Sequence, residues 1–131
     1  MRRIIIVISC LLLGLMAGPV LAHPDKLAGA DWVLAGQTGE RAPYLRFDGG
    51  RVGGLSGCNR FGGRYEADGD MLAFSPMMAT RMACRPDIMK AEQTFMDMLA
   101  KVKAMVLDSD RLELLDGEGK VLATFDRRVA Q

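Results

Sequence analysis

One segment of this chain, from Pro86 to Lys103, has the periodicity of an α-helix, and short segments with the periodicity of β-strands lie on both sides of it. Its apolar residues recur at steps of three and four: Ile88, Ala91, Phe95, Met98 or Leu99, and Val102. Asp87 and Glu92 lie toward the positive end of the helix dipole, and Lys103 lies near the negative end. A single amphipathic helix among strands predicts an α+β fold.

The flanking strands are short and are separated by turn signals. We expect strands at 31–34, 44–47, 51–55, 61–66 and 71–74 before the helix, and at 104–107, 112–115 and 121–125 after it. Trp32 is the natural large core residue, and the glycines between Gly53 and Gly63 predict bulges or sharp bends. We therefore expect a strongly curved antiparallel β-sheet or partial β-barrel closed by the amphipathic helix, because closure protects the edges of a sheet.

Residues 1–22 have the pattern of a cleaved signal peptide. A basic start and an apolar run over 4–16 are followed by small side chains up to Ala22, after which we expect the cut. The run is shorter than the roughly 20 residues that cross a bilayer, and Pro19 interrupts it. The surroundings of Cys10 loosely resemble a lipoprotein acylation site, but the apolar run continues past it. We interpret Cys10 as part of the signal and expect no lipid anchor.

Removal of the signal leaves about 109 residues, the length of one compact domain. We divide them into an N-terminal segment, 23–30, and a domain, 31–128. Of 17 basic and 16 acidic residues, two arginines leave with the signal, so the net charge is about −1. This balance favours neither nucleic acid nor an anionic membrane as a partner. We expect a periplasmic or secreted monomer without a stable membrane span.

Cys58 and Cys84 are the cysteines that remain, and in an oxidising compartment two thiols on a small domain usually form a disulfide. A loop of about 26 residues closed in this way stabilises a domain by roughly 3.5 kcal/mol. Two free buried thiols are one alternative. A redox pair is another, since Cys84 precedes the helix, where a thiolate is stabilised. Structural zinc needs four Cys or His ligands, more than the mature chain offers.

Other residues give little support for metal or catalytic chemistry. His23 would be the amino-terminal residue, but it has no second histidine to complete a copper site or a serine triad. Eight methionines remain after processing, and thioethers bind Cu(I), although methionine is also a common filler of apolar gaps. The carboxylates between Asp108 and Glu118 fall in expected turns. We therefore expect no cofactor, no metal and no enzyme.

The segments from Gly57 to Gly63 and from Met78 to Cys84 resemble the META domain, also called the HslJ-like family of bacterial envelope proteins. The residues that match the family motif are Gly57, Cys58, Asn59, Gly63, Thr80, Met82 and Cys84. The resemblance implies a small β-rich fold with one helix, export, and a role in envelope biology, heat shock or stress, with no established catalytic chemistry. Asn59, Arg60 and Arg81 are candidates for contact with a partner, unless Asn59 caps its local turn.

Three functions follow from these observations. The first is a non-enzymatic interaction domain of the cell envelope, whose partner is an unknown envelope protein. The second is a small-molecule or lipid binder that uses the inside or mouth of the curved sheet. An enclosed apolar pocket favours the binder and an exposed apolar patch favours the interaction domain, so a filled interior argues against the binder. A weaker third alternative is a copper- or redox-responsive protein that uses methionine and cysteine.

Overall fold

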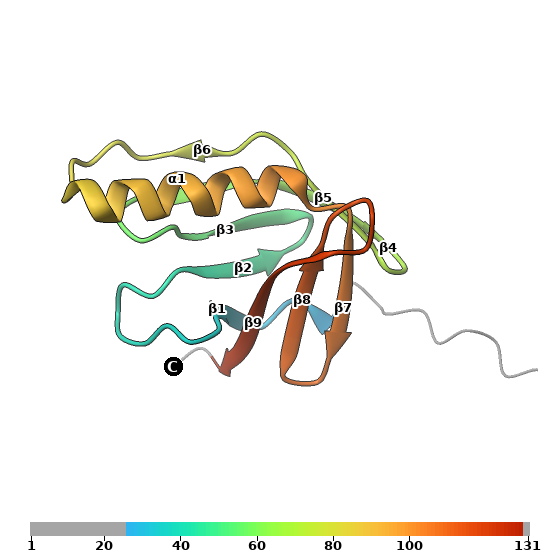
Figure 1. Ribbon diagram of the computed structural model, residues 1–131. Helices are drawn as coiled ribbons and strands as arrows, with labels where there is room; N and C mark the ends of the chain where they lie inside the picture. The colour runs from blue at the N-terminus through green and yellow to red at the C-terminus, as the bar shows by residue number, and fades with distance from the viewer. Residues whose placement is uncertain (1–25, 130–131) are drawn as a thin grey trace, which may run out of the picture.

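The computed structural model describes residues 26–129, in which one helix stands against nine strands (Figure 1). The expected signal peptide, Cys10 and His23 lie outside the described residues. The elements are β1 (Ala30–Leu34), β2 (Tyr44–Asp48), β3 (Arg51–Leu55), β4 (Arg60–Asp68), β5 (Met71–Phe74), β6 (Met78–Ala79), α1 (Pro86–Lys101), β7 (Ala104–Asp108), β8 (Arg111–Leu115) and β9 (Val121–Val129).

Eight of the strands form a closed antiparallel barrel. They are ordered β3-β2-β1-β9-β8-β7-β5-β4, and β4 pairs again with β3 to complete the ring. The first half of β4 pairs with β3 and its second half pairs with β5, so the strand passes from one neighbour to the other. β6 lies outside the ring and pairs with β4 at Phe61 and Gly62. The predicted α+β fold, a curved sheet closed by one helix, is confirmed.

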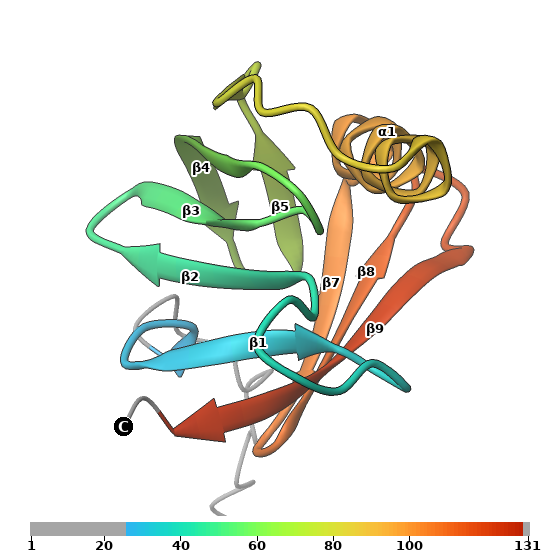
Figure 2. The ribbon, with the colours of Figure 1, turned by 90° about the vertical axis from the view of Figure 1, so that its left-hand side faces the viewer.

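The helix lies near the narrowest seam of this barrel. β5 and β7 share the register pair Met71 and Ala104, together with backbone hydrogen bonds from Leu72 N–H to Lys103 O (3.2 Å) and from Met105 N–H to Asp70 O (2.8 Å). The chain travels from β5 to β7 through β6 and α1, and Figure 2 shows α1 beside the end of β7 that lies away from the β7–β8 turn. The helix thus covers the barrel where its strands share the fewest bonds.

Side chains from the strands and the helix fill the barrel. Trp32 is fully buried and donates its Nε1–H to the carbonyl oxygen of Leu27 (2.9 Å), so packing begins before the expected domain start at Asp31. On the helix, Phe95 places its ring 5.9 Å from that of Phe61 and 6.2 Å from that of Phe125. The largest fully buried side chains are Trp32, Phe47, Phe125, Leu27, Leu45, Leu72, Leu99, Met105, Leu112, Leu114, Val102 and Cys58. The structure therefore has the filled interior that argues against an internal ligand.

The buried face of α1 has other residues than the apolar stripe that we expected. The buried residues of α1 are Glu92, Phe95 and Leu99, whereas Ala91, which we expected on this face, is exposed. The helix also ends at Lys101 rather than Lys103. The helix ends there because the backbone of Val102 is extended, and the Val102 N–H donates to the carbonyl oxygen of Leu99. β6, which is two residues long, was not expected at all.

We predict that Leu99→Ala lowers the free energy of unfolding by about 2–5 kcal/mol, because Leu99 is 1 % exposed and its loss leaves a cavity between helix and barrel. Urea unfolding followed by circular dichroism measures the change. Met89→Ala, on the exposed side of the same helix, is the matched control and should change stability by less than about 1 kcal/mol. Equal losses in the two variants would contradict this account of helix packing.

Candidate functional site

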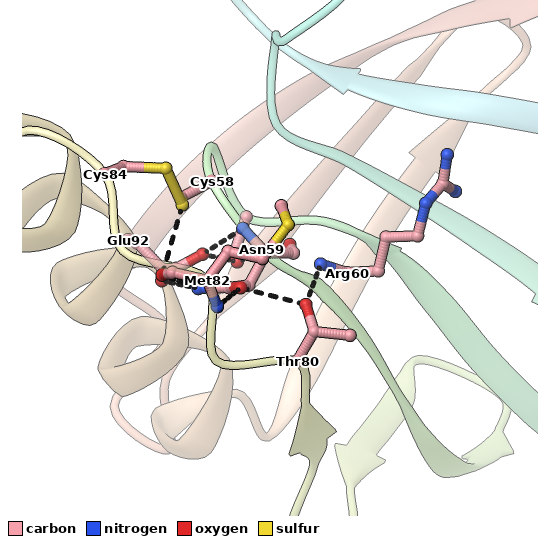
Figure 3. Close-up of a disulfide and its surroundings, with 8 residues drawn as sticks. Cys58, Asn59, Arg60, Thr80, Met82, Cys84 and Glu92 are labelled. Carbon is pink, nitrogen blue, oxygen red and sulfur yellow. Dashed lines mark hydrogen bonds between the residues drawn. A yellow bond between two sulfur atoms is a disulfide. The ribbon is translucent and has the colours of Figure 1, made fainter.

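The segments 57–63 and 78–84 meet at a disulfide between Cys58 and Cys84 (Figure 3). Cys58 lies in the turn between β3 and β4 and is 1 % exposed, and Cys84 lies two residues before α1 and is half-buried. Their Cα atoms are 6.2 Å apart. The predicted disulfide is confirmed, and the structure does not have the two free thiols that were the alternative. The bond fastens the start of the helix to the barrel.

The turn that carries Cys58 depends on Gly57. Its φ of +121° lies in the region that only glycine adopts readily. This conformation brings the chain back on itself, so that Ser56 donates its N–H to the carbonyl oxygen of Asn59 (3.0 Å). The turn places the side chains of Cys58 and Asn59 toward the segment that precedes α1 and toward the helix itself, as Figure 3 shows.

Asn59 is 2 % exposed and uses its side chain for long-range hydrogen bonds. Its Nδ2 donates to Glu92 Oε2 (2.8 Å), and its Oδ1 accepts from the N–H of Met82 (2.7 Å) and the hydroxyl of Thr80 (2.9 Å). These partners lie 21 or more residues away in the sequence, so Asn59 does not serve as the local turn cap that was the alternative. It joins β4, the chain after β6, and the helix.

Glu92 is a carboxylate buried on the inner side of the helix. Oε1 accepts hydrogen bonds from the Ser56 hydroxyl (2.5 Å) and from the Asn59 N–H (2.7 Å). Burial alone raises the pKa of Glu92, but the side-chain donors of Ser56 and Asn59 and the backbone N–H groups of Asn59 and Cys58 outweigh it and lower that pKa. Glu92 is therefore held as a carboxylate by donors from the β3–β4 turn.

Thr80 connects this cluster to the surface of the barrel. Its hydroxyl accepts a hydrogen bond from the Arg60 N–H (3.1 Å), and its own N–H donates to the Arg60 carbonyl oxygen (2.9 Å). The backbone of Arg60 is thereby fixed from both sides. The Arg60 side chain is exposed, and Figure 3 shows it pointing away from the disulfide.

Most residues of this cluster belong to the predicted motif, and two of its members do not. Of the motif residues, only Gly63 lies elsewhere; a Cβ there would approach the Met77 sulfur to 2.5 Å, so a larger residue would displace the Met77 side chain. Of the contact candidates, Asn59 is buried in the cluster, whereas Arg60 and Arg81 are exposed. Ser56 and Glu92 were missed. The signal for Glu92 was its place in the apolar stripe, four residues after Ile88 and three before Phe95.

The cluster is arranged to hold the chain together. Within the described part of the chain, every buried side-chain nitrogen or oxygen has a hydrogen-bond partner. Between residues 26 and 129, no three His, Cys, Asp or Glu side chains come together as metal ligands. The carboxylate oxygens of Glu92 are occupied by donors from Ser56 and Asn59. The cluster therefore presents structural hydrogen bonds rather than a free acid or base.

The methionines of the described residues are divided between the core and the surface. Met105 is buried in the core, Met77 and Met96 are half-buried and pack against the core, and Met78 and Met82 are 82 % and 53 % exposed.

No helix among the described residues has the length and apolar character needed to cross a bilayer.

Comparison with known proteins identifies the family and the fold. A family model described as META domain matches residues 25–129. The NMR structure of a protein from Burkholderia xenovorans is 21% identical, with a TM-score of 0.65 over 95% of this chain and 100% of that one. A second NMR structure is 22% identical, with a TM-score of 0.64 over 81% of this chain and 95% of that one.

A crystal structure of a DUF4847 family protein from Bacteroides vulgatus is 14% identical, with a TM-score of 0.59 over 80% of this chain and 96% of that one. At these identities the likeness to solved structures is one of fold. No curated protein matches the chain.

We predict that replacing both Cys58 and Cys84 by serine lowers the free energy of unfolding by about 2–5 kcal/mol, because the unfolded chain regains the freedom of the loop. Thermal and urea unfolding measure the loss. The reduced wild-type protein is the control and should unfold like the double variant. An unchanged melting temperature, or free sulfhydryls in the unfolded and unreduced protein, would contradict the stabilising role of the disulfide.

We also predict that Glu92 stabilises the folded protein at neutral pH and that this contribution is lost in acid. Because the folded-state pKa of Glu92 is lowered, its contribution is complete above the unfolded value of about 4.3 and is lost as the pH falls through the folded value. Glu92→Gln should lower stability at neutral pH by about 1–3 kcal/mol, since an amide NH₂ would face the Asn59 and Ser56 donors. The stability of Glu92→Gln should then fall less steeply than that of the wild type as the pH decreases below about 4.3.

Urea unfolding at a series of pH values measures this dependence. Some acid sensitivity should remain in Glu92→Gln, because protonation of Asp31 also lowers stability: burial raises the pKa of Asp31, but hydrogen bonds and ion pairs with Arg46 and Arg128 lower it by more. Glu118→Gln, in the exposed β8–β9 turn, is the matched control and should follow the wild-type curve. Parallel curves for the wild type and Glu92→Gln would rule out the role assigned to Glu92.

Proposed function

The chain belongs to the META domain family, and on that basis we propose that it is an exported, non-enzymatic protein of the bacterial cell envelope that acts by binding a partner, with a role connected to stress. Its fold serves as a rigid support, and the binding takes place on the outer surface. No catalytic residue and no cofactor are part of this proposal.

The disulfide supports the export part of the proposal. Disulfides persist in oxidising compartments such as the periplasm and are rare in the cytosol. The bond between Cys58 and Cys84 joins two family motifs and lies next to a buried polar cluster, so it is part of the folded core of the domain. The signal-peptide pattern of residues 1–22 is consistent with the same location.

The observation that carries the interaction part is the contrast between a filled interior and exposed methionines. Trp32, Phe47 and Phe125 fill the barrel, whereas Met78 and Met82 expose 82 % and 53 % of their surface on the segment around β6. Methionine adapts its shape to different apolar partners and is favoured at binding surfaces. The arrangement supports binding outside the barrel.

The two alternative functions have less support. A small-molecule or lipid binder would use the inside of the barrel, where buried aromatic and aliphatic side chains already lie. A copper-responsive protein would bring several thioethers together, whereas Met105 lies in the core and Met78 and Met82 lie on the surface. Surface binding remains the function that the structure supports best.

Crosslinking in living cells tests the proposal. A photoreactive amino acid replaces Met78 in the full chain, expressed with residues 1–22 in its native host, and the adducts are identified after cell fractionation. We expect a mature protein that begins at His23, in the periplasmic fraction, with a specific envelope protein attached. The matched control replaces Met71, which is 67 % exposed at the start of β5 and should not give the same adduct.

Two results would contradict the proposal. Retention in the cytoplasm with residues 1–22 still attached would refute export. The same abundant proteins attached at Met78 and at Met71 would refute a dedicated interaction through this surface.

A further inference from the structure

We propose that the outer face of β2, β3 and β4 is a docking groove for an extended acidic segment of a partner polypeptide, whose carboxylates stand four residues apart. This inference rests on the proposed function and names both the surface and the chemistry of the partner. It requires a hollow on the outer face, cationic side chains at the right separation, and a floor that a polypeptide can approach.

The hollow lies above two neighbouring glycines. Gly53 of β3 and Gly62 of β4 are register partners, and both belong to the lining of a surface groove of about 370 Å³. Arg46 of β2 is the register partner of Gly53 on one side, and Met78 of β6 is the register partner of Gly62 on the other. The glycines therefore leave the backbone bare between an arginine and an exposed methionine.

The two ends of the groove carry cationic side chains. Arg51 lies near one end and Arg60 near the other, and neither forms an ion pair within residues 26–129. Arg46 is less available to a partner, because its guanidinium donates to Asp31 at 2.6 Å and 3.0 Å, although Arg128 shares that carboxylate. Asp48 is the one carboxylate among the residues that line the groove, and it is the register partner of Arg51 on β2. On the other side, the register partner of Arg51 is Arg64 of β4, so two arginines stand beside one carboxylate at this end. The Arg51 end, like the Arg60 end, thus keeps a net positive charge.

The separation of these ends fits an extended chain. Arg60 is the register partner of Leu55, which lies four residues after Arg51 on β3. At about 3.3 Å per residue, the two ends are roughly 13 Å apart. Carboxylates at positions i and i+4 of an extended peptide have the same spacing and point to the same side. An open trough of this kind suits a polypeptide better than a small molecule, which usually binds in an enclosed site.

Gly62 is the observation that most directly indicates a close approach. Its φ is not positive, and a Cβ built on it would meet only the Val52 carbonyl oxygen, at 3.7 Å, which is ordinary contact. In contrast, a Cβ on Gly54 would overlap the Tyr44 carbonyl oxygen. Glycine weakens a strand interior, and where neither conformation nor packing requires it, it marks a place where another backbone or a ligand comes close.

The buried cluster positions one end of this groove. Thr80 holds the backbone of Arg60 by two hydrogen bonds and is itself held by Asn59. The same contacts keep β6 alongside β4, so that Met78 borders the floor. Asn59 and Thr80 of the family motif therefore support the proposed docking surface without lining it, whereas Gly63 of the motif belongs to the lining.

The test is a titration of the ¹⁵N-labelled full mature chain with the blocked peptide acetyl-Glu-Ala-Val-Ala-Glu-amide, followed by NMR. We expect saturable shifts of the amide signals of Gly53 and Gly62, which weaken as salt is added. Gly62→Val fills the floor with a side chain that suits a strand, so it should keep or raise the melting temperature and weaken binding at least tenfold. Arg60→Gln should also weaken binding several-fold.

The controls separate the groove from general charge effects. Lys120→Gln removes one charge from the exposed β8–β9 turn and should bind like the wild type. The peptide with glutamine in place of both glutamates should not bind. The proposal is overturned if the glutamine peptide binds equally well, if Gly62→Val folds and binds normally, or if inorganic phosphate shifts the same signals as strongly, which would indicate a simple anion site.

The result can be distinguished from a failure of the proposed function. If the acidic peptide does not bind but crosslinking through Met78 still captures a specific envelope protein, the acidic docking groove is wrong and the interaction function stands. If the chain is not exported, the proposed function fails whatever the peptide does.

Discussion

The hydrogen bonds between Glu92 and the β3–β4 turn are the interaction on which the rest of the structure depends. A buried carboxylate is costly unless donors surround it, so its position is fixed by the groups that satisfy it. Here the donors come from Ser56 and Asn59. Apolar contacts of Phe95 and Leu99 would allow the helix to slide or rotate by small amounts, but directional bonds to one carboxylate do not. The helix therefore has one place on the barrel.

The disulfide and the Glu92 carboxylate both connect the β3–β4 turn to the helix region, but they stabilise this connection in different ways. The bond between Cys58 and Cys84 limits the unfolded chain, whereas the bonds to Glu92 act only after the helix has docked. Both act on the connection between β5 and β7, two strands that share one register pair. Asn59 extends the same constraint through Thr80 to Arg60 on the outer surface. Core and surface are thus linked by one asparagine.

Periodicity and turn chemistry were sufficient to predict the barrel strands, the helix and the fold class, because each depends on residues close together in sequence. The disulfide was also predictable, since few cysteines remained to be paired. The functions of Asn59 and Glu92 were not. Asn59 was interpreted as a contact for a partner or as a cap of its own turn, and Glu92 was assigned to the helix dipole, because a local pattern contains no information on a partner 33 residues away. β6 was missed because a strand of two residues is too short to show the alternation of polar and apolar residues by which strands are predicted.

The glycines between β3 and β4 show how one short stretch meets several requirements at once. Gly57 is needed for a positive φ in the turn, Gly54 is needed because a side chain would overlap the Tyr44 carbonyl oxygen, and at Gly63 the Met77 side chain occupies the space. Each of these three glycines thus has a role in the turn or in the packing of the barrel. Gly62 meets none of these needs; it lies in β4, between its register partners Gly53 of β3 and Met78 of β6. A residue that weakens its strand without serving the fold is better explained by what the strand touches, and its outward position places that contact on the surface of the barrel rather than within it.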